Sequence, residues 1–166
     1  VLTYKSIHLK QKPNSLHHPT PLISILMSVR DTESYLPACL DSILAQSYTH
    51  WELVAVNNVS SDRSAEGLRE YGQRDPRIRV FDTDREGLIP ALQTSYRHSR
   101  GILLNRMDSD DIMPKDKLKH LCQAWEQYGR GTVVAGGTKY FMDEGSVGGG
   151  FRRYERWLNQ IAKDQS

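Results

Sequence analysis

The stretch PLISILMSVRDTESYLPACLDSILAQSYTHWELVAVNN, residues 21–58, decides the fold that we expect for this chain. Its first apolar run, residues 22–29, is nearly continuous, which is typical of a strand covered on both faces of a sheet. A helical stripe follows, because apolar side chains recur every three or four positions between residues 36 and 44. A second apolar run at residues 51–56 completes the unit. This order predicts parallel strands joined by a crossover helix.

The same alternation continues along the chain. Further strands are predicted at residues 77–81, 102–107 and 132–137, and helices at about 62–73, from Pro90, from Pro114 and from Phe151. Strands that alternate with helices of this length build a mostly parallel sheet with helices on both faces. We therefore expect a three-layer α/β/α fold of the Rossmann-like kind.

The pattern divides the chain into three parts. Residues 1–20 are polar and without periodicity, so we expect a loose N-terminal extension. Residues 21–142 carry the alternating pattern of one domain. Residues 143–166 combine a glycine-rich loop with an amphipathic helix, whose apolar side is formed by Phe151, Tyr154, Trp157, Leu158 and Ile161. If nothing covers that side, self-association into a homodimer is expected.

Composition excludes several classes of function. The net charge is +2 and no block of basic residues is present, so a nucleic-acid groove is not expected. No apolar run approaches the roughly 20 residues of a membrane span, and the first residues lack the apolar core of a secretory signal. The two cysteines imply no disulfide framework. These features predict a cytoplasmic protein, at most associated with the inner face of the membrane.

Three polar turns follow predicted strands, at residues 28–31, 57–62 and 108–111. In parallel sheets ligands bind at the carboxyl ends of the strands, where such turns lie together. The convergence predicts where a binding site lies, although it does not identify the ligand.

The last of these turns is unusually acidic. In the triplet formed by Asp108, Ser109 and Asp110, the two carboxylates can lie on the same side of an extended chain. Paired carboxylates suit Mn²⁺ or Mg²⁺, with water and substrate phosphates completing the coordination shell. The alternative is a solvated turn whose aspartates, Asp111 above all, cap the helix expected at Pro114.

The spaced motifs together resemble a known family. The stretch quoted above, followed by REGLIPALQTSYRHSRGILLNRMDSDDIMPKDKL and GGGFRRYERWLN, resembles the family 2 glycosyltransferases of GT-A fold. The match runs in order from Pro21 to about Leu121 and then resumes. It implies that residues 21–142 bind a nucleotide sugar, usually a UDP-sugar. It also implies transfer of the sugar, with inversion at the anomeric carbon, to a hydroxyl of a saccharide or lipid-linked acceptor.

The resemblance implies roles for the first two turns. Ser28, Val29 and Arg30 would lie against the base and ribose, with Arg30 where many relatives have an aromatic residue. Asn57 and Asn58 stand where relatives typically have two aspartates. Asn58 would accept the N–H of the base through its amide oxygen, without the added strength of a charged acceptor. The alternative is that both asparagines only bond the backbone of their own turn.

For the third turn the resemblance implies a metal site. Asp110 would bind the metal directly, and Asp108 would approach the ribose or a metal-bound water. Ser109 would face the other way or offer its backbone to the donor. In the loop at residues 85–88, Gly87 would allow the backbone to approach the donor closely.

The general base is not found in the matched residues. In this family it is supplied later in the chain, so it is expected beyond Ser166, and this chain is expected to be the donor-binding part, truncated before the acceptor site. A non-catalytic interaction module with the same fold remains an alternative. A nucleotidyltransferase is a weaker one, since SVRDTESYLP lacks the glycine-rich loop expected there.

Overall fold

The computed structural model describes residues 5–7, 20–129, 131, 133–142 and 145–164. The chain divides into two compact units, His17–Lys119 and a second one made of Val1–Leu16 with His120–Ser166. Among the described residues, no helix combines the length and the apolar composition needed to cross a membrane.

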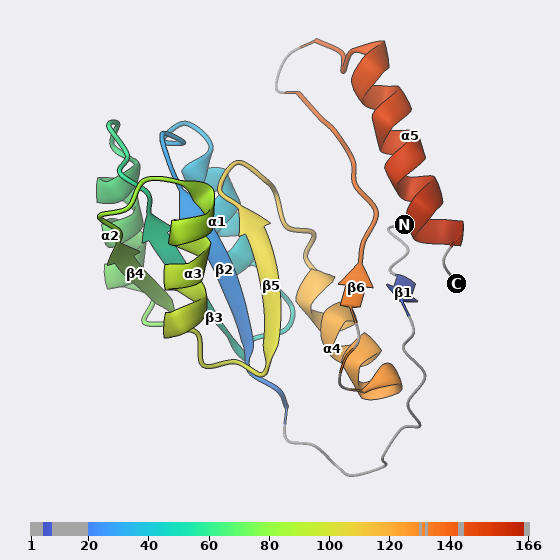
Figure 1. The fold of residues 1–166 in the computed structure, drawn as a ribbon, viewed down its shortest axis with the longest axis horizontal. Helices are drawn as coiled ribbons and strands as arrows, with labels where there is room; N and C mark the ends of the chain where they lie inside the picture. The colour runs from blue at the N-terminus through green and yellow to red at the C-terminus, as the bar shows by residue number, and fades with distance from the viewer. Residues whose placement is uncertain (1–4, 8–19, 130, 132, 143–144, 165–166) are drawn as a thin grey trace. The chain divides into compact units, whose positions relative to one another are not determined.

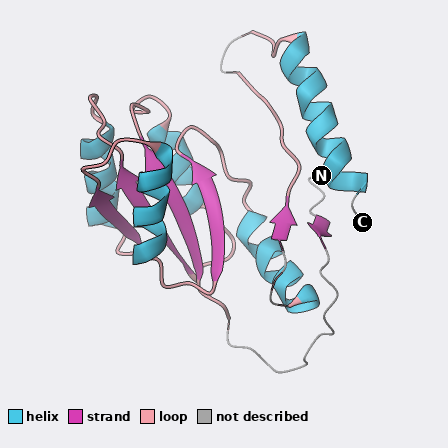
Figure 2. Cartoon of the chain, viewed as in Figure 1, coloured by secondary structure: helices cyan, strands magenta, loops and turns pink. Residues whose placement is uncertain are grey.

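The unit His17–Lys119 contains a four-stranded parallel sheet with strand order β4-β3-β2-β5. Helix α3 lies on one face of the sheet, and α1 and α2 lie on the other (Figures 1 and 2). This arrangement confirms the predicted α/β fold. In chain order the elements are β2 (Ile23–Val29), α1 (Leu36–Leu44), β3 (Trp51–Asn57), α2 (Ser64–Arg74), β4 (Ile78–Asp82), α3 (Leu88–His98) and β5 (Leu103–Asp108).

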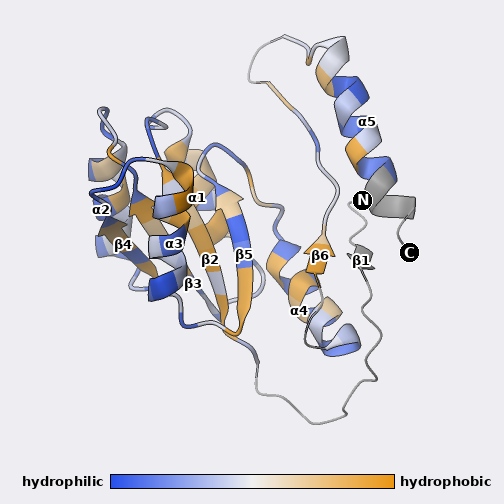
Figure 3. Ribbon diagram, viewed as in Figure 1, coloured by the Kyte–Doolittle hydropathy of each residue, from blue (hydrophilic) through white to orange (hydrophobic). Residues whose placement is uncertain are grey.

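The central strands β2 and β3 form the core of this unit. They are coloured mainly as hydrophobic in Figure 3, and their side chains are almost all buried, because helices cover both faces of the sheet. Helix α1 adds the stripe predicted from its spacing, which consists of the buried side chains Leu36, Cys39, Leu40 and Ile43.

The register of the sheet brings the ends of its strands to one edge. Ser28 of β2 is the partner of Asp108 on β5, and Val29 is the partner of Asn57 on β3. Asn57 in turn is the partner of Asp82 at the end of β4. All four strands therefore end at the same level, and the turns after them share one rim.

The opposite edge of the sheet holds a buried carboxylate, Glu52, which is 5% exposed. It accepts hydrogen bonds from the hydroxyl of Ser24 at 2.7 Å, from the backbone N–H of Arg100 at 2.6 Å and from the guanidinium of Arg79 at 2.8 Å. Burial alone would raise the pKa of Glu52, but these three donors outweigh it and lower the pKa.

Gly101 lies at the same edge, just before β5. A Cβ atom at this position would lie 2.6 Å from both the carbonyl oxygen of Leu22 and the backbone nitrogen of Ser24. The N–H of Gly101 also donates to the hydroxyl of Ser24 at 2.8 Å. Only glycine allows this close approach between β5 and the start of β2.

The helix after the acidic turn, α4 (Lys117–Tyr128), begins three residues later than the sequence predicted. Pro114 is not its first residue, because the carbonyl of Pro114 is bonded to the buried side chain of Gln46 at 2.9 Å. The other end of that amide accepts the N–H of Leu118 at 3.2 Å. Gln46, two residues after the end of α1, therefore fixes where α4 starts.

The second unit contains β1 (Lys5–Ile7) paired antiparallel with β6 (Val133–Ala135), together with α5 (Gly149–Asp164). The sequence pattern predicted β6 but not β1, which lies in the polar N-terminal residues. An extended segment runs beside α5, since Asn159 bonds both the N–H and the carbonyl of Thr138, at 2.7 and 2.8 Å. Four aromatic rings of this helix and segment lie in contact: Tyr140, Phe151, Tyr154 and Trp157. Those of the helix are about half exposed or more, and Tyr140 is partly buried.

Candidate functional site

The three polar turns predicted to converge do lie on one rim of the sheet, after β2, β3 and β5. Asn57, Ser28 and Asp108 mark their positions on three adjacent strands. Because neighbouring strands are about 4.8 Å apart, groups on these turns can contact a single small ligand.

The turn after β5 crowds three carboxylates together. Burial raises the pKa of Asp111, and the negative charges of Asp110 and Asp108 raise it further. Two cations lie nearby: Arg106 donates to a carboxylate oxygen of Asp108, and the charges of Asp111 and Asp108 oppose the lowering of the pKa of Lys117 by burial. The repulsion among the acids is therefore relieved only in part.

Cys39 lies beneath this turn, on α1. Its thiol approaches the carbonyl oxygen of Asp108 at 3.6 Å. Burial raises the pKa of Cys39 to about 12, with further contributions from the carboxylates of the turn. The sulfur is therefore a thiol at neutral pH, and it offers no thiolate to a metal.

The donor atoms of the acidic turn match a hard divalent cation. Carboxylate oxygens suit Mn²⁺ and Mg²⁺, which are commonly held by one or two carboxylates together with substrate phosphates and water. Within the described ranges, no group of three or more His, Cys, Asp or Glu side chains is placed to hold a metal ion. Two carboxylates of the turn would leave most of the coordination shell of such a cation to phosphates and water.

In the turn after β3, Asn57 bonds its own surroundings. Its amide oxygen accepts the N–H of Ser60 at 3.1 Å, and its amide nitrogen donates to Asp82 at 2.9 Å. Val59 in this turn has a φ of 56°, which is unusual for a β-branched residue. Asn57 therefore bonds the backbone of its own turn and ties that turn to the end of β4.

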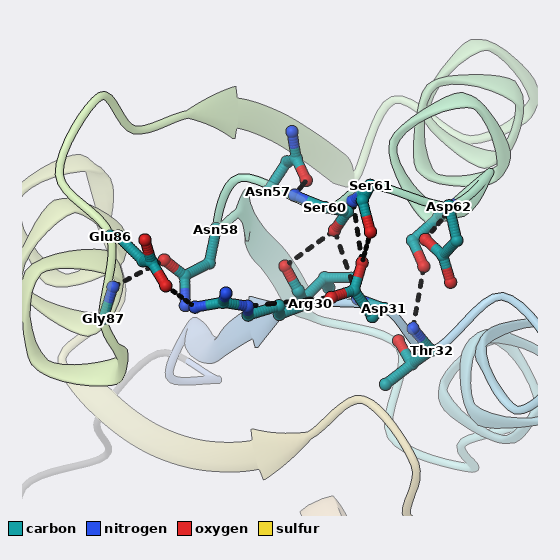
Figure 4. Close-up of polar contacts among 12 residues, drawn as sticks. Arg30, Asp31, Thr32, Asn57, Asn58, Ser60, Ser61, Asp62, Glu86 and Gly87 are labelled. Atoms are coloured by element: carbon teal, nitrogen blue, oxygen red, sulfur yellow. Dashed lines mark hydrogen bonds and ion pairs between the residues drawn. The ribbon is translucent and has the colours of Figure 1, made fainter.

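Asn58 has a different environment. It is 4% exposed, and its amide oxygen accepts the backbone N–H of Gly87 at 2.9 Å (Figure 4). Its own backbone N–H donates to the carbonyl of Val29 at 2.8 Å. Gly87 has a φ of 125°, a value that favours glycine, so the loop before α3 can approach Asn58 closely.

Arg30 extends across the site toward the same loop. Its guanidinium forms an ion pair with Glu86 at 2.5 Å and lies 3.7 Å from the carboxylate of Asp31 (Figure 4). Both Arg30 and Glu86 are substantially exposed. The guanidinium that we predicted to lie against the base and ribose is therefore paired with an acidic side chain.

Hydrogen bonds between the first two turns were not predicted from the sequence. Asp31 accepts the N–H of Ser61 at 2.7 Å, and its φ is 50°. The N–H of Glu33 donates to Asp62 at 3.0 Å, and Figure 4 shows both turns side by side. The cluster of Ser and Asp after β3 signals a turn, but its partners lie about 30 residues away and leave no local signal.

The remaining predicted residues differ in how they reach the rim. Val29 is fully buried, so its side chain belongs to the core. Ser109 is also buried, and its hydroxyl accepts a hydrogen bond from Thr32 at 3.1 Å, which joins the turns after β2 and β5. Ser28 is half-buried and is the partner of Asp108.

Comparison of the sequence with known proteins gives a consistent result. Residues 24–164 match the family described as Glycosyl transferase family 2. The chain is 34% identical over 107 residues to the uncharacterized glycosyltransferase EpsJ of Bacillus subtilis, an alignment that covers 64% of this chain and 31% of EpsJ. It is 33% identical over 122 residues to the glycosyltransferase GlyA of Streptococcus pneumoniae, covering 74% of this chain and 17% of GlyA. The chain therefore spans less than a third of either relative.

Solved structures share the fold. TarS 1–349 of S. aureus, in complex with UDP, matches with a TM-score of 0.59 and 20% identity, over 63% of this chain and 32% of TarS. The mannosyltransferase PcManGT of Pyrobaculum calidifontis, in complex with GDP-Man and Mn²⁺, matches with a TM-score of 0.58 and 22% identity, over 72% of this chain and 35% of the enzyme.

Proposed function

The chain belongs to family 2 of the glycosyltransferases and has the GT-A fold, and from this we propose that residues 21–142 bind the nucleotide-sugar donor of a metal-dependent, inverting glycosyl transfer. A UDP-sugar is the donor that the sequence resemblance implies. The observation that carries the proposal is the rim itself, where an acidic turn that suits a divalent cation lies two strands away from the buried amide of Asn58.

The acidic turn would hold the diphosphate end of the donor. Asp108 and Asp110 would bind Mn²⁺ or Mg²⁺, and a bound cation neutralises the charge that develops on a departing diphosphate. Arg106 orients the carboxylate of Asp108 through its hydrogen bond. Lys117 adds positive charge close to Asp111 and Asp108, where it favours an anionic ligand.

The other acids of the rim suit binding rather than proton transfer. Hydrogen bonds from Ser61 lower the pKa of Asp31, and hydrogen bonding from Ser64 lowers that of Asp62. The bond from Asn57 lowers the pKa of Asp82 in the same way. A carboxylate with a lowered pKa is a weak general base. We therefore assign the base, and the saccharide or lipid-linked acceptor, to the remainder of the whole protein.

A non-catalytic module is the second candidate, because Asn57 is committed to its own turn and Arg30 to Glu86. Calorimetry separates the two. The proposal expects UDP to bind the chain, and expects Mn²⁺ to strengthen that binding. Asp110→Asn should remove most of the Mn²⁺ effect, whereas the control Glu70→Gln, an exposed acid on α2 paired with Arg74, should leave it intact. A folded sample that binds no nucleotide diphosphate with or without Mn²⁺ would favour the module.

The exposed aromatic rings of α5 support a further part of the proposal, that the chain forms a homodimer through this face. Phe151, Tyr154 and Trp157 are each about half exposed or more. A patch of this kind favours association in water. Sedimentation should show dimers that dissociate on dilution, and Trp157→Glu should abolish them. Monomers at every concentration would contradict this part alone.

A further inference from the structure

The two carboxylates assigned to the metal differ in their surroundings. Asp108 forms an ion pair with the guanidinium of Arg106, the residue two positions before it on β5. Side chains two positions apart on a strand lie on the same face, so one strand supplies both partners. Among the residues that the structure describes, no Lys, Arg or His forms an ion pair with Asp110. One of the two acids is therefore paired with a cation of the protein, and the other is open.

The ion pair of Arg106 and Asp108 is accessible to a ligand. The two side chains are 53% and 46% exposed, and β5 is the last strand of the described parallel sheet. Water screens an exposed pair of this kind, so it can exchange partners at little cost. A guanidinium has donors only, and it binds a phosphate through two parallel N–H groups. Arg106 can therefore move from the carboxylate to an anionic ligand and remain paired.

Arg106 and a divalent cation compete for the same carboxylate. While the guanidinium is paired with Asp108, it occupies one carboxylate oxygen and adds positive charge beside the turn, which repels a second cation. Asp110 alone offers a single carboxylate, and the rest of the coordination shell is left to water and substrate phosphates. The chain without a nucleotide therefore offers the cation a weak site.

We propose that Arg106 makes metal binding dependent on the nucleotide. It occupies Asp108 in the free chain and moves to the diphosphate of the donor, so that Asp108 joins Asp110 at the metal only when the donor is present. This step rests on the proposed function, which assigns the metal to these two acids. Arg106 is thus a positioning residue that acts through Asp108. Because coupling between two ligands is reciprocal, the metal and the donor strengthen each other's binding.

Binding of Mn²⁺ to the full chain without nucleotide tests the proposal, with free Mn²⁺ measured by electron paramagnetic resonance. Arg106→Gln should tighten Mn²⁺ binding at least about fivefold, because it releases Asp108 and removes the nearby positive charge. A gain is diagnostic, since a variant that had only lost structure would bind the ion less well. Arg106→Lys keeps the charge and should stay within about twofold of the unmodified chain.

Two further variants show whether the gain depends on Asp108. Arg69→Gln removes an equally exposed arginine that pairs with Asp82, at the end of β4 on the same rim. Strands β4 and β5 are three positions apart, about 14 Å, which exceeds the screening length of about 8 Å at physiological salt. This control should therefore stay within about twofold. Adding Asp108→Asn to Arg106→Gln restores the net charge of the unmodified turn and should cancel the gain. A gain that survives in the double variant overturns the inference.

The same titration with saturating UDP, corrected for the Mn²⁺–UDP complex in solution, measures how much the nucleotide tightens Mn²⁺ binding. Arg106→Gln should reduce this factor at least about fivefold. If Arg106→Gln changes neither Mn²⁺ affinity nor this factor, the inference is overturned and the proposed function stands. An unmodified chain that binds neither Mn²⁺ nor UDP defeats both. If Arg106→Gln does not fold, Arg106→Thr, whose β-branched side chain suits a strand, takes its place in every measurement.

Discussion

Carboxylates lie at both edges of the parallel sheet, the amino edge where the strands begin and the carboxyl edge where they end, and their pKa values shift in opposite directions. At the amino edge Glu52 is buried among three donors, and its pKa is lowered. At the carboxyl edge Asp111 lies close to two further acids, and its pKa is raised. The charge of Glu52 is balanced within the protein, whereas the charges of the three acids are balanced only in part. The comparison teaches that pairing, rather than burial, separates a carboxylate that holds the fold from one that is available for binding.

The largest effect is expected at the amino edge. Glu52→Gln should lower the free energy of unfolding by about 3 kcal/mol, because it leaves the partly buried guanidinium of Arg79 without its counter-charge. Urea denaturation followed by circular dichroism measures this. Glu70→Gln, which removes an exposed acid, should stay within about 0.5 kcal/mol of the unmodified chain. Equal effects of the two substitutions would contradict the prediction that the buried ion pair contributes more to stability than the exposed one.

The pH dependence of that first effect sharpens the comparison. Because the pKa of Glu52 is lowered on folding, its contribution is present above the pKa of an unfolded glutamate, about 4.3. The contribution is lost as the pH falls through the pKa of the folded state. The difference in unfolding free energy between the unmodified chain and Glu52→Gln should therefore be constant near neutrality and shrink below about pH 4. A difference that grows on acidification would contradict the assignment.

Asp111→Asn should show the opposite sign at the carboxyl edge. A pKa raised on folding means that the folded chain holds its proton longer than the unfolded one, so ionisation of Asp111 destabilises the fold as the pH rises through the folded pKa. The substitution removes this cost. Its unfolding free energy relative to the unmodified chain should increase from pH 3 to pH 7, by less than about 1 kcal/mol. Saturating Mn²⁺ with a nucleotide should reduce the gain, because the cation stabilises the ionised acids.

The smallest effect on stability is expected for Glu86→Gln, which breaks the exposed ion pair with Arg30. Water screens such an exposed pair, so thermal unfolding should change little. Nucleotide affinity should change more than stability does, since the substitution releases the guanidinium of Arg30 at the rim. A large loss of stability with unchanged affinity would show that this pair stabilises the fold, as Glu52 does, and has no effect on nucleotide binding.

Much of the fold could be predicted from the sequence, because buried parallel strands appear as apolar runs and crossover helices as apolar residues at helical spacing. The positions of the rim turns followed from where those runs end. The contacts across the rim could not be predicted. Gly87 is hydrogen-bonded to Asn58 across 29 residues of sequence, and Glu86 pairs with Arg30 only because the loop before α3 folds back. Whether Asn58 presents an oxygen or a nitrogen likewise depends on that distant contact.

Two boundaries escaped prediction for related reasons. The start of α4 is fixed by Gln46, a side chain from the loop after α1, so local signals at Pro114 could not place it. The strand Lys5–Ile7 is too short and polar to stand out, and it forms through pairing with Val133–Ala135. In both cases a contact distant in sequence outweighs the local preference.

The position of Gly101 at one end of β5 affects the position of Asp108 at the other end. Gly101 lies so close to Leu22 and Ser24 that the chain entering β5 cannot shift relative to the start of β2. This contact therefore fixes the register of β5 along β2. Asp108 lies seven residues after Gly101, a distance of about 23 Å along an extended chain that stretches very little. A methyl group added at Gly101 would push the whole strand, and the acids at its far tip would be displaced relative to the turns after β2 and β3. The geometry of the rim is thus set in part at the opposite end of the sheet.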